Sequence, residues 1–177
     1  MRVITGTARG RRLQEPQNMA IRPTTDMVKE AVFNIIQFDI EGRRVLDLFA
    51  GTGQLGIEAA SRGAAAVTFV DQNRTAANLV RENLERCGLR GQVHQADALA
   101  FLEHCGQFDL IFVDPPYDSG IYENVLEKII RFDILLEGGI IICESRRETT
   151  LSDIAGLRRK EYRYGKVKLT VYTKEVE

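Results

Sequence analysis

The sequence predicts an α/β fold with a mostly parallel, seven-stranded sheet that ends in an antiparallel hairpin. From residue 45 onward, short apolar segments alternate with segments of helical periodicity, which is typical of parallel strands joined by helices. A glycine-rich turn follows the first apolar segment. Near the end, apolar and polar residues alternate at a period of two on both sides of Gly165, which indicates antiparallel strands. We therefore expect one doubly wound domain preceded by a short extension.

The expected extension covers residues 1–40 and consists of a β-hairpin followed by a helix. Arg2–Thr5 and Arg11–Leu13 can pair as short strands on either side of a glycine-containing turn. Thr24 or Thr25 can cap the helix, because a threonine oxygen accepts hydrogen bonds from the first helical turn. The apolar stripe of this helix is Val28, Val32, Ile35 and Ile36.

Residues 41–177 form the main expected domain, in which strands and helices alternate. The expected parallel strands are Val45–Phe49, Val67–Val70, Gln92–Gln95, Phe108–Val113 and Ile140–Glu144. The expected helices are Leu55–Ser61, Arg74–Cys87, Ala98–Cys105 and Tyr122–Phe132. The closing hairpin is Leu157–Tyr164 with Lys166–Thr173. In a doubly wound sheet the first and fourth strands are neighbours, so the loops that follow them border one crevice.

Composition limits the class of protein. Of the 177 residues, 44% are apolar and 28% are charged, as in ordinary globular proteins. There is no run of 18 apolar residues and no signal-peptide pattern, so we expect a cytoplasmic protein without a membrane partner. The three cysteines are widely spaced and odd in number, which favours neither disulfides nor a metal site. We expect a monomer without metal.

Charge is distributed unevenly along the chain. Residues 1–44 carry eight Lys and Arg against five Asp and Glu, and residues 145–177 carry nine against five. The segment between them carries seven basic residues against fifteen acidic ones. Basic ends that lie together in space would suit a phosphate backbone. Charges scattered over a solvated surface explain the same numbers equally well.

The glycine turn predicts a cofactor site. Gly51, Gly53 and Gly56 have the G-x-G-x-x-G spacing, which lets the backbone approach a ligand at a helix N-terminus. Asp71 ends the next strand, where an acid can accept hydrogen bonds from ribose hydroxyls. This pattern suits NAD as well as S-adenosylmethionine. Asp47 favours S-adenosylmethionine, because a carboxylate there can hold the ammonium of the methionine part, although it can also bond to loop amides.

A second motif, Asp114-Pro115-Pro116-Tyr117, directly follows the apolar strand that ends at residue 113. The prolines stiffen the loop and leave carbonyls as acceptors. The Asp114 carboxylate and the Pro115 carbonyl can accept from the two N–H bonds of an aromatic exocyclic amine, which localises its lone pair for attack on a sulfonium methyl group. Tyr117 can stack on the target base, or it can pack on the core. The motif therefore predicts an amino-methyltransferase that releases S-adenosylhomocysteine.

Further cofactor contacts are expected around the glycine turn and the next two strand ends. Asp97 can accept from the adenine amino group, although a helix cap is an almost equal interpretation. The other expected contacts are Phe49, Ala50, Gln72 and Ala98.

These motifs together resemble the bacterial 16S ribosomal RNA guanine-N2 methyltransferases of the RsmD type. The resemblance covers nearly the whole chain and includes the segments 2–4, 10–13, 22–26, 28–34, 46–53, 55–59 and 114–117, with Tyr164-Gly165 and Tyr172 near the end. Segment 22–26, Arg-Pro-Thr-Thr-Asp, is its most specific part. Gln54, where relatives are expected to have a small residue, and Gln72, in place of an acid, depart from the pattern.

The resemblance implies a Rossmann-like class I methyltransferase fold whose N-terminal extension grips RNA. It implies methyl transfer from S-adenosylmethionine to N2 of one guanine, with 16S rRNA or the small ribosomal subunit as partner. The RNA contacts expected in the extension are Arg9, Arg11, Arg12, Arg22 and Thr24.

Four other functions remain open from sequence alone. Adenine-N6 methylation of DNA or RNA would use the same loop, but DNA enzymes with it usually carry a larger target-recognition region. Methylation of a protein glutamine usually has Asn in place of Asp114. An NAD-dependent oxidoreductase leaves the loop at 114–117 unexplained. A non-catalytic RNA-binding protein is the fourth.

Overall fold

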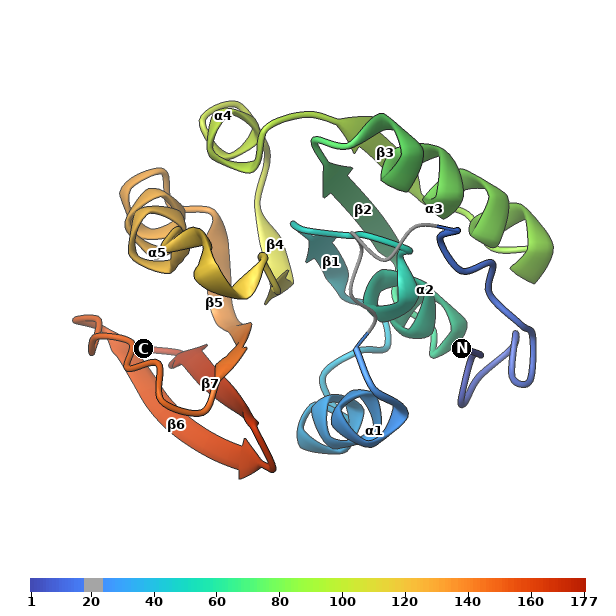
Figure 1. Cartoon of the computed structure of the whole chain (residues 1–177). Helices are drawn as coiled ribbons and strands as arrows, with labels where there is room; N and C mark the ends of the chain where they lie inside the picture. Colours follow the sequence, from blue (N-terminus) through green and yellow to red (C-terminus); the bar gives the residue numbers. More distant parts are fainter. Residues whose placement is uncertain (18–23) are drawn as a thin grey trace.

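A seven-stranded sheet organises the molecule. The computed structural model describes residues 1–17 and 24–177, and the strand order is β3-β2-β1-β4-β5-β7-β6 (Figure 1). The strands are β1 (Arg44–Asp47), β2 (Ala66–Asp71), β3 (Gln92–Gln95), β4 (Phe108–Val113), β5 (Leu135–Arg146), β6 (Leu157–Tyr164) and β7 (Val167–Lys174). The first five run parallel, and β6 and β7 pair antiparallel at one side. The expected α/β fold with a C-terminal hairpin is confirmed.

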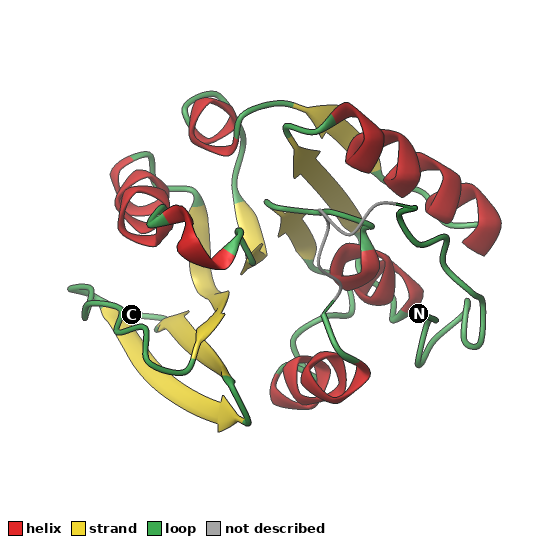
Figure 2. Cartoon of the chain, viewed as in Figure 1, coloured by secondary structure: helices red, strands yellow, loops and turns green. Residues whose placement is uncertain are grey.

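Helices cover both faces of the sheet (Figure 2). They are α1 (Asp26–Ile35), α2 (Gln54–Ser61), α3 (Arg74–Cys87), α4 (Ala98–Leu102) and α5 (Tyr122–Arg131), with a short 3-10 helix, η1 (Tyr117–Ser119). Alternate residues of β4 supply the two cores: Leu110 and Phe112 pack with α1, α2 and α3, while Ile111 and Val113 pack with α4 and α5. This period of two is what a strand buried on both faces requires.

Local sequence explains the starts of several helices. The side chain of Thr25 accepts from the backbone N–H of Val28 and caps α1, so Thr25 rather than Thr24 is the cap. Asn73 caps α3 in the same way, and Gly88 ends that helix in the left-handed conformation. The structure confirms the expected range of α3, whereas α4 ends earlier than expected, at Leu102.

The expected N-terminal hairpin is not formed as two strands. Residues 1–13 fold back through a turn and pair in one antiparallel bridge between Arg2 and Arg12, with backbone hydrogen bonds from the Val3 N–H to the Arg11 carbonyl at 2.9 Å and from the Leu13 N–H to the Met1 carbonyl at 3.1 Å. The segment is held instead by helix α2, because Val3, Ala8 and Leu13 join the core cluster that contains α1, α2 and α3.

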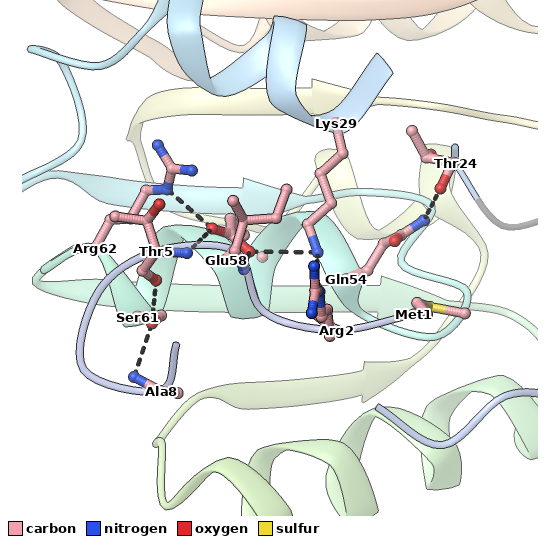
Figure 3. A network of polar contacts seen from close by, with 12 residues as sticks. Met1, Arg2, Thr5, Ala8, Thr24, Lys29, Gln54, Glu58, Ser61 and Arg62 are labelled. Atoms are coloured by element: carbon pink, nitrogen blue, oxygen red, sulfur yellow. Dashed lines mark hydrogen bonds and ion pairs between the residues drawn. The ribbon is translucent and has the colours of Figure 1, made fainter. Parts of the chain in front are cut away.

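Polar contacts with α2 fix the N-terminal segment (Figure 3). The Glu58 carboxylate accepts from the backbone N–H groups of Ile4 and Thr5, each at 2.9 Å, and pairs with Lys29 Nζ at 3.3 Å. Lys29 also donates to the Arg2 carbonyl at 2.8 Å. Both charged side chains are fully buried, and burial lowers the pKa of Lys29.

Close packing at Gly6 completes the attachment. A Cβ atom on this residue would lie 1.9 Å from the Ser61 carbonyl oxygen, and the backbone has a positive φ of 93°. Only glycine has no Cβ atom to clash with Ser61 and also adopts this positive φ without strain. The Ser61 side chain meanwhile donates to the Thr5 carbonyl and accepts from the Ala8 N–H. The N-terminal segment is thus built onto α2 by specific contacts.

Strand β5 begins earlier than the sequence indicated. It starts at Leu135 and runs through two glycines, with a shift in its register against β4 between Phe108 and Leu110. Among the residues that the structure describes, no helix is long and apolar enough to cross a membrane.

Candidate active site

A cleft of about 500 Å³ opens at the carboxyl ends of the parallel strands. The loops after β1 and β4 form its two main walls, because these strands are neighbours in the sheet. Its volume lies within the range of about 300–1,000 Å³ that small-molecule sites occupy. The lining residues include Asp47–Thr52, Gln54, Asp71–Asn73, Ala96–Ala98, Asp114–Ser119, Glu144 and Arg146.

Asp47 ends β1 at the floor of this cleft. Its side chain is buried and accepts from the Gly56 backbone N–H at 3.0 Å, so it does bond to a loop amide. Burial raises the pKa of Asp47 to about 7, an effect that the Gly56 hydrogen bond opposes and the Asp71 charge reinforces. A cationic group beside Asp47 would favour its ionised form.

The glycine turn leads from Asp47 into α2. Gly53 precedes the helix with a positive φ of 83°, and a Cβ there would lie 3.2 Å from atoms of both Ile57 and Val80. Asp71, at the end of β2, accepts from the Gly51 N–H at 2.9 Å. The turn is thereby held against the end of the neighbouring strand.

Asp97 lies after β3 and caps α4 by accepting from the Ala100 N–H at 3.0 Å. It is nevertheless one of the cleft-lining residues, with Ala98 beside it. Asp97 is therefore a helix cap, as one of the two interpretations expected. Because it also lines the cleft, its contact with adenine stays a prediction.

On the opposite wall, Asp114 and Tyr117 come from the loop after β4. The Thr24 hydroxyl lies 3.2 Å from Asp114 Oδ2 and 3.2 Å from Glu144 Oε2. Burial and the nearby Glu144 carboxylate raise the pKa of Asp114 well above its usual range. The Tyr117 hydroxyl donates to Glu144 Oε1 at 3.3 Å, and the Arg146 guanidinium stands over the Tyr117 ring at 5.6 Å.

The cleft brings together nearly all the side chains expected at the cofactor and target sites. Gly53 is not among its lining residues, although it shapes the turn. Arg9, Arg11 and Arg12 are exposed on the N-terminal turn and do not line the cleft. Arg22 lies outside the described residues.

Thr24 has a different position from the one expected. It was expected as an RNA contact, but its side chain is 7% exposed and lies beside the two carboxylates in the cleft. The position of Thr24 results from a tertiary contact, because its hydroxyl lies beside Asp114, which is ninety positions further along the chain.

Several cleft residues were given no role by the sequence analysis, among them Gln54, Glu144 and Arg146. Glu144 had a usable signal, because an acid at the end of an apolar parallel strand lies at the same sheet edge as Asp114. Arg146 follows two residues later and pairs with Asp118 at 3.1 Å.

Gln54 gives a test of whether a cationic, amino-acid-bearing cofactor fits. Its Nε2 donates to the Thr24 carbonyl at 2.9 Å, while its buried Oε1 has no hydrogen-bond partner among the described residues. A buried acceptor of this kind is normally satisfied by a ligand or water. Together with the Asp47 carboxylate it offers two acceptors to an ammonium group, so the residues present fit S-adenosylmethionine.

Comparisons with known proteins find similarity over almost the entire chain. The family model described as "Conserved hypothetical protein 95" matches residues 1–173. Protein YlbH of Bacillus subtilis, named as a candidate rRNA methyltransferase, is 40% identical over 183 residues, which cover 98% of this chain and 99% of that protein. Ribosomal RNA small subunit methyltransferase D of Escherichia coli is 33% identical over 183 residues, covering 100% and 91%.

Comparison with solved structures also finds similarity over the whole chain. The structure of protein yhhF from Escherichia coli has a TM-score of 0.90 and 33% sequence identity, and the match covers 100% of this chain and 99% of that one. The fold and the sequence similarity therefore extend together over both the N-terminal segment and the sheet.

Proposed function

Because the chain belongs to the Conserved hypothetical protein 95 family, we propose that it methylates the exocyclic N2 of a guanine in bacterial 16S ribosomal RNA. The resemblance that the motifs indicated is confirmed by relatives named ribosomal RNA small subunit methyltransferase D. The chain is a methyltransferase that uses S-adenosylmethionine, and the oxidoreductase interpretation is set aside. The observation that carries the finer proposal is that Asp114 and the glycine turn line the same cleft.

The glycine-turn wall is the proposed cofactor side. S-adenosylmethionine supplies a methyl group on a sulfonium when bound. In this proposal Asp47 and Gln54 hold its ammonium, and Asp71 accepts from the ribose hydroxyls. Gly51 and Gly53 keep the backbone close to the cofactor, since both have the positive φ that a side chain would disfavour. Asp97 and Ala98 border the adenine, with Phe49, Ala50 and Gln72 as further contacts.

The opposite wall is the proposed target side. The Asp114 carboxylate and the Pro115 carbonyl accept from the two N–H bonds of the guanine amine and localise its lone pair, while Pro116 keeps the loop rigid. When bound, the cofactor would supply its sulfonium methyl group to this nitrogen and would leave as S-adenosylhomocysteine. Asp114 would stabilise the positive charge that develops on the nitrogen, and the nitrogen would then release one proton to solvent. Tyr117 stacks on the base.

RNA binding completes the proposal. Residues 1–40 form the RNA-contacting extension and residues 41–177 the domain that transfers the methyl group. Arg9, Arg11 and Arg12 are exposed near one another on the N-terminal turn, where they can contact phosphates. The target guanine leaves its stack to enter the cleft. The protein acts as a monomer in the cytoplasm, on 16S rRNA or the small ribosomal subunit.

Nucleoside mass analysis tests this function. 16S rRNA from cells lacking the protein is digested before and after incubation with the purified protein and methyl-labelled S-adenosylmethionine. We expect the label in N2-methylguanosine. Label in N6-methyladenosine, or transfer to DNA but not to rRNA, would contradict the proposal and favour adenine methylation.

A further inference from the structure

A second hollow lies at the amino ends of the parallel strands, the opposite edge of the sheet from the cleft. The first residues of β1, β2, β3 and β4 all line it. Its volume is about 530 Å³, close to that of the cleft, and none of the described residues that line it also lines the cleft. We call it the basic groove, after its lining side chains Arg44, Arg90, His94 and His104, which accompany the aromatic residues Phe101 and Phe108.

The groove is open because helix α4 is short. Alternate residues of a strand point to the same face, and Ala66 and Thr68 of β2 and Gln92 and His94 of β3 line the groove. Helix α4 packs on this side of the sheet but ends at Leu102. The first residues of β2 and β3 therefore border a hollow where a doubly wound sheet ordinarily has a covering helix.

The charge of the groove is of one sign. None of the described residues that line it is acidic, although the whole chain has a net charge of −1. Arg43 pairs with two carboxylates, whereas the exposed guanidinium of the next residue, Arg44, stands 6.0 Å over the Phe108 ring. Within the described part of the chain, neither Arg44 nor the exposed Arg90 forms an ion pair. Both cations are thus available to an anionic ligand.

Aromatic rings lie beside these cations. The rings of His94 and Phe101 are 5.2 Å apart and tilted by 49°. Cations that bind phosphates, next to flat rings on which bases stack, are the combination with which proteins bind single-stranded nucleic acid. The chemistry of the groove therefore suits a nucleotide chain.

Helix α4 separates the groove from the cleft. Asp97 and Ala98 at its start line the cleft, whereas Phe101 and His104 at its end line the groove. A helix of five residues is only about 7.5 Å long. An RNA strand that crosses α4 therefore reaches both sites.

We propose that the basic groove binds the RNA strand that flanks the target guanine, with Arg44 and Arg90 pairing with its phosphates and Phe101 contacting a flanking base. This inference rests on the proposed function and adds to it an RNA contact outside the N-terminal segment. Because the groove lies outside the cleft, it contributes to RNA affinity rather than to the methyl-transfer step.

Removal of both charges tests the groove. Affinity for a 16S rRNA fragment that contains the target guanine is measured by fluorescence anisotropy over a series of salt concentrations, for wild type and for Arg44→Gln combined with Arg90→Gln. Affinity at low salt should fall by at least about tenfold, and the slope of log affinity against log salt should decrease by about 1.4, since each phosphate contact with a single strand contributes about 0.7. In the transfer assay KM for RNA should rise, while kcat and the affinity for S-adenosylhomocysteine stay within about twofold.

Two further variants separate charge from disturbance of the fold. Arg44→Lys combined with Arg90→Lys retains both charges and should keep the wild-type salt dependence. The matched control is Arg131→Gln, at an exposed arginine of α5 that does not line the groove, which should leave RNA affinity unchanged.

Wild-type RNA affinity and salt dependence in the double glutamine variant overturn the inference. If inorganic phosphate then binds to wild type but not to that variant, the groove is a site for a free anion instead. A wild-type protein that binds the fragment without methylating it overturns the proposed function, while the binding comparison, which needs no transfer, still decides whether the groove holds RNA.

Discussion

Replacing Glu58 by glutamine should destabilise the whole protein through one buried ion pair. The Glu58 carboxylate and Lys29 Nζ are 3.3 Å apart and both side chains are fully buried. The same carboxylate accepts from two backbone N–H groups of the N-terminal segment and from Arg62. Glutamine keeps the size and one acceptor oxygen, but it leaves the Lys29 charge without its partner.

The expected loss follows from that uncompensated charge. Breaking a buried pair by removing one partner typically costs about 3–5 kcal/mol. Because glutamine retains part of the hydrogen bonding, we expect about 3 kcal/mol, which lowers the thermal midpoint of a domain of this size by about 6–12 °C. Burial already lowers the pKa of Lys29, so Lys29 can lose its proton in the variant. The loss of the proton reduces the destabilisation.

Urea unfolding followed by circular dichroism measures this loss. The matched control is Glu85→Gln, the same substitution at an exposed position on α3, which should change stability by less than about 0.5 kcal/mol. Adding Lys29→Met to Glu58→Gln removes the buried charge and should restore part of the stability. If Glu58→Gln unfolds within about 1 kcal/mol of wild type, the buried pair does not secure the N-terminal segment as argued.

Two further predictions concern ligands. Affinity for S-adenosylhomocysteine should weaken as the pH falls below about 7, because Asp47 binds a proton there that must leave before the carboxylate pairs with the ammonium. Isothermal titration from pH 5.5 to 8.5 checks this, and an equal slope in Asp47→Asn would argue against that assignment. Reversing Arg9, Arg11 and Arg12 to glutamate should weaken RNA binding and reduce its salt dependence. A drop in stability with normal RNA binding would instead make the arginines structural.

Much of the fold could be predicted because its signals are local. The sequence predicted α3 over Arg74–Cys87, which is the range that the structure has, and the apolar run of residues 108–113 predicted the strand β4. The crevice between the loops after β1 and β4 followed from topology alone, because neighbouring parallel strands end at the same edge.

The parts that sequence reasoning missed depend on contacts between distant residues. Thr24 meets Asp114 across ninety positions, and Glu58 holds Thr5 across 53 positions. The sequence around these residues gives no indication of either contact. The early start of β5 was hidden by Gly138 and Gly139, since paired glycines are typical of a loop, and only pairing with β4 makes that segment a strand.

The most direct test of the central claim compares chemistry and cofactor binding in Asp114→Ala. Methyl transfer to 16S rRNA is measured under single-turnover conditions, and affinity for S-adenosylhomocysteine is measured by titration. Because the variant loses the acceptor that stabilises charge on the amine, transfer should fall by at least about a hundredfold. Cofactor affinity should stay within a few-fold of wild type. A variant that transfers the methyl group at the wild-type rate would contradict the account.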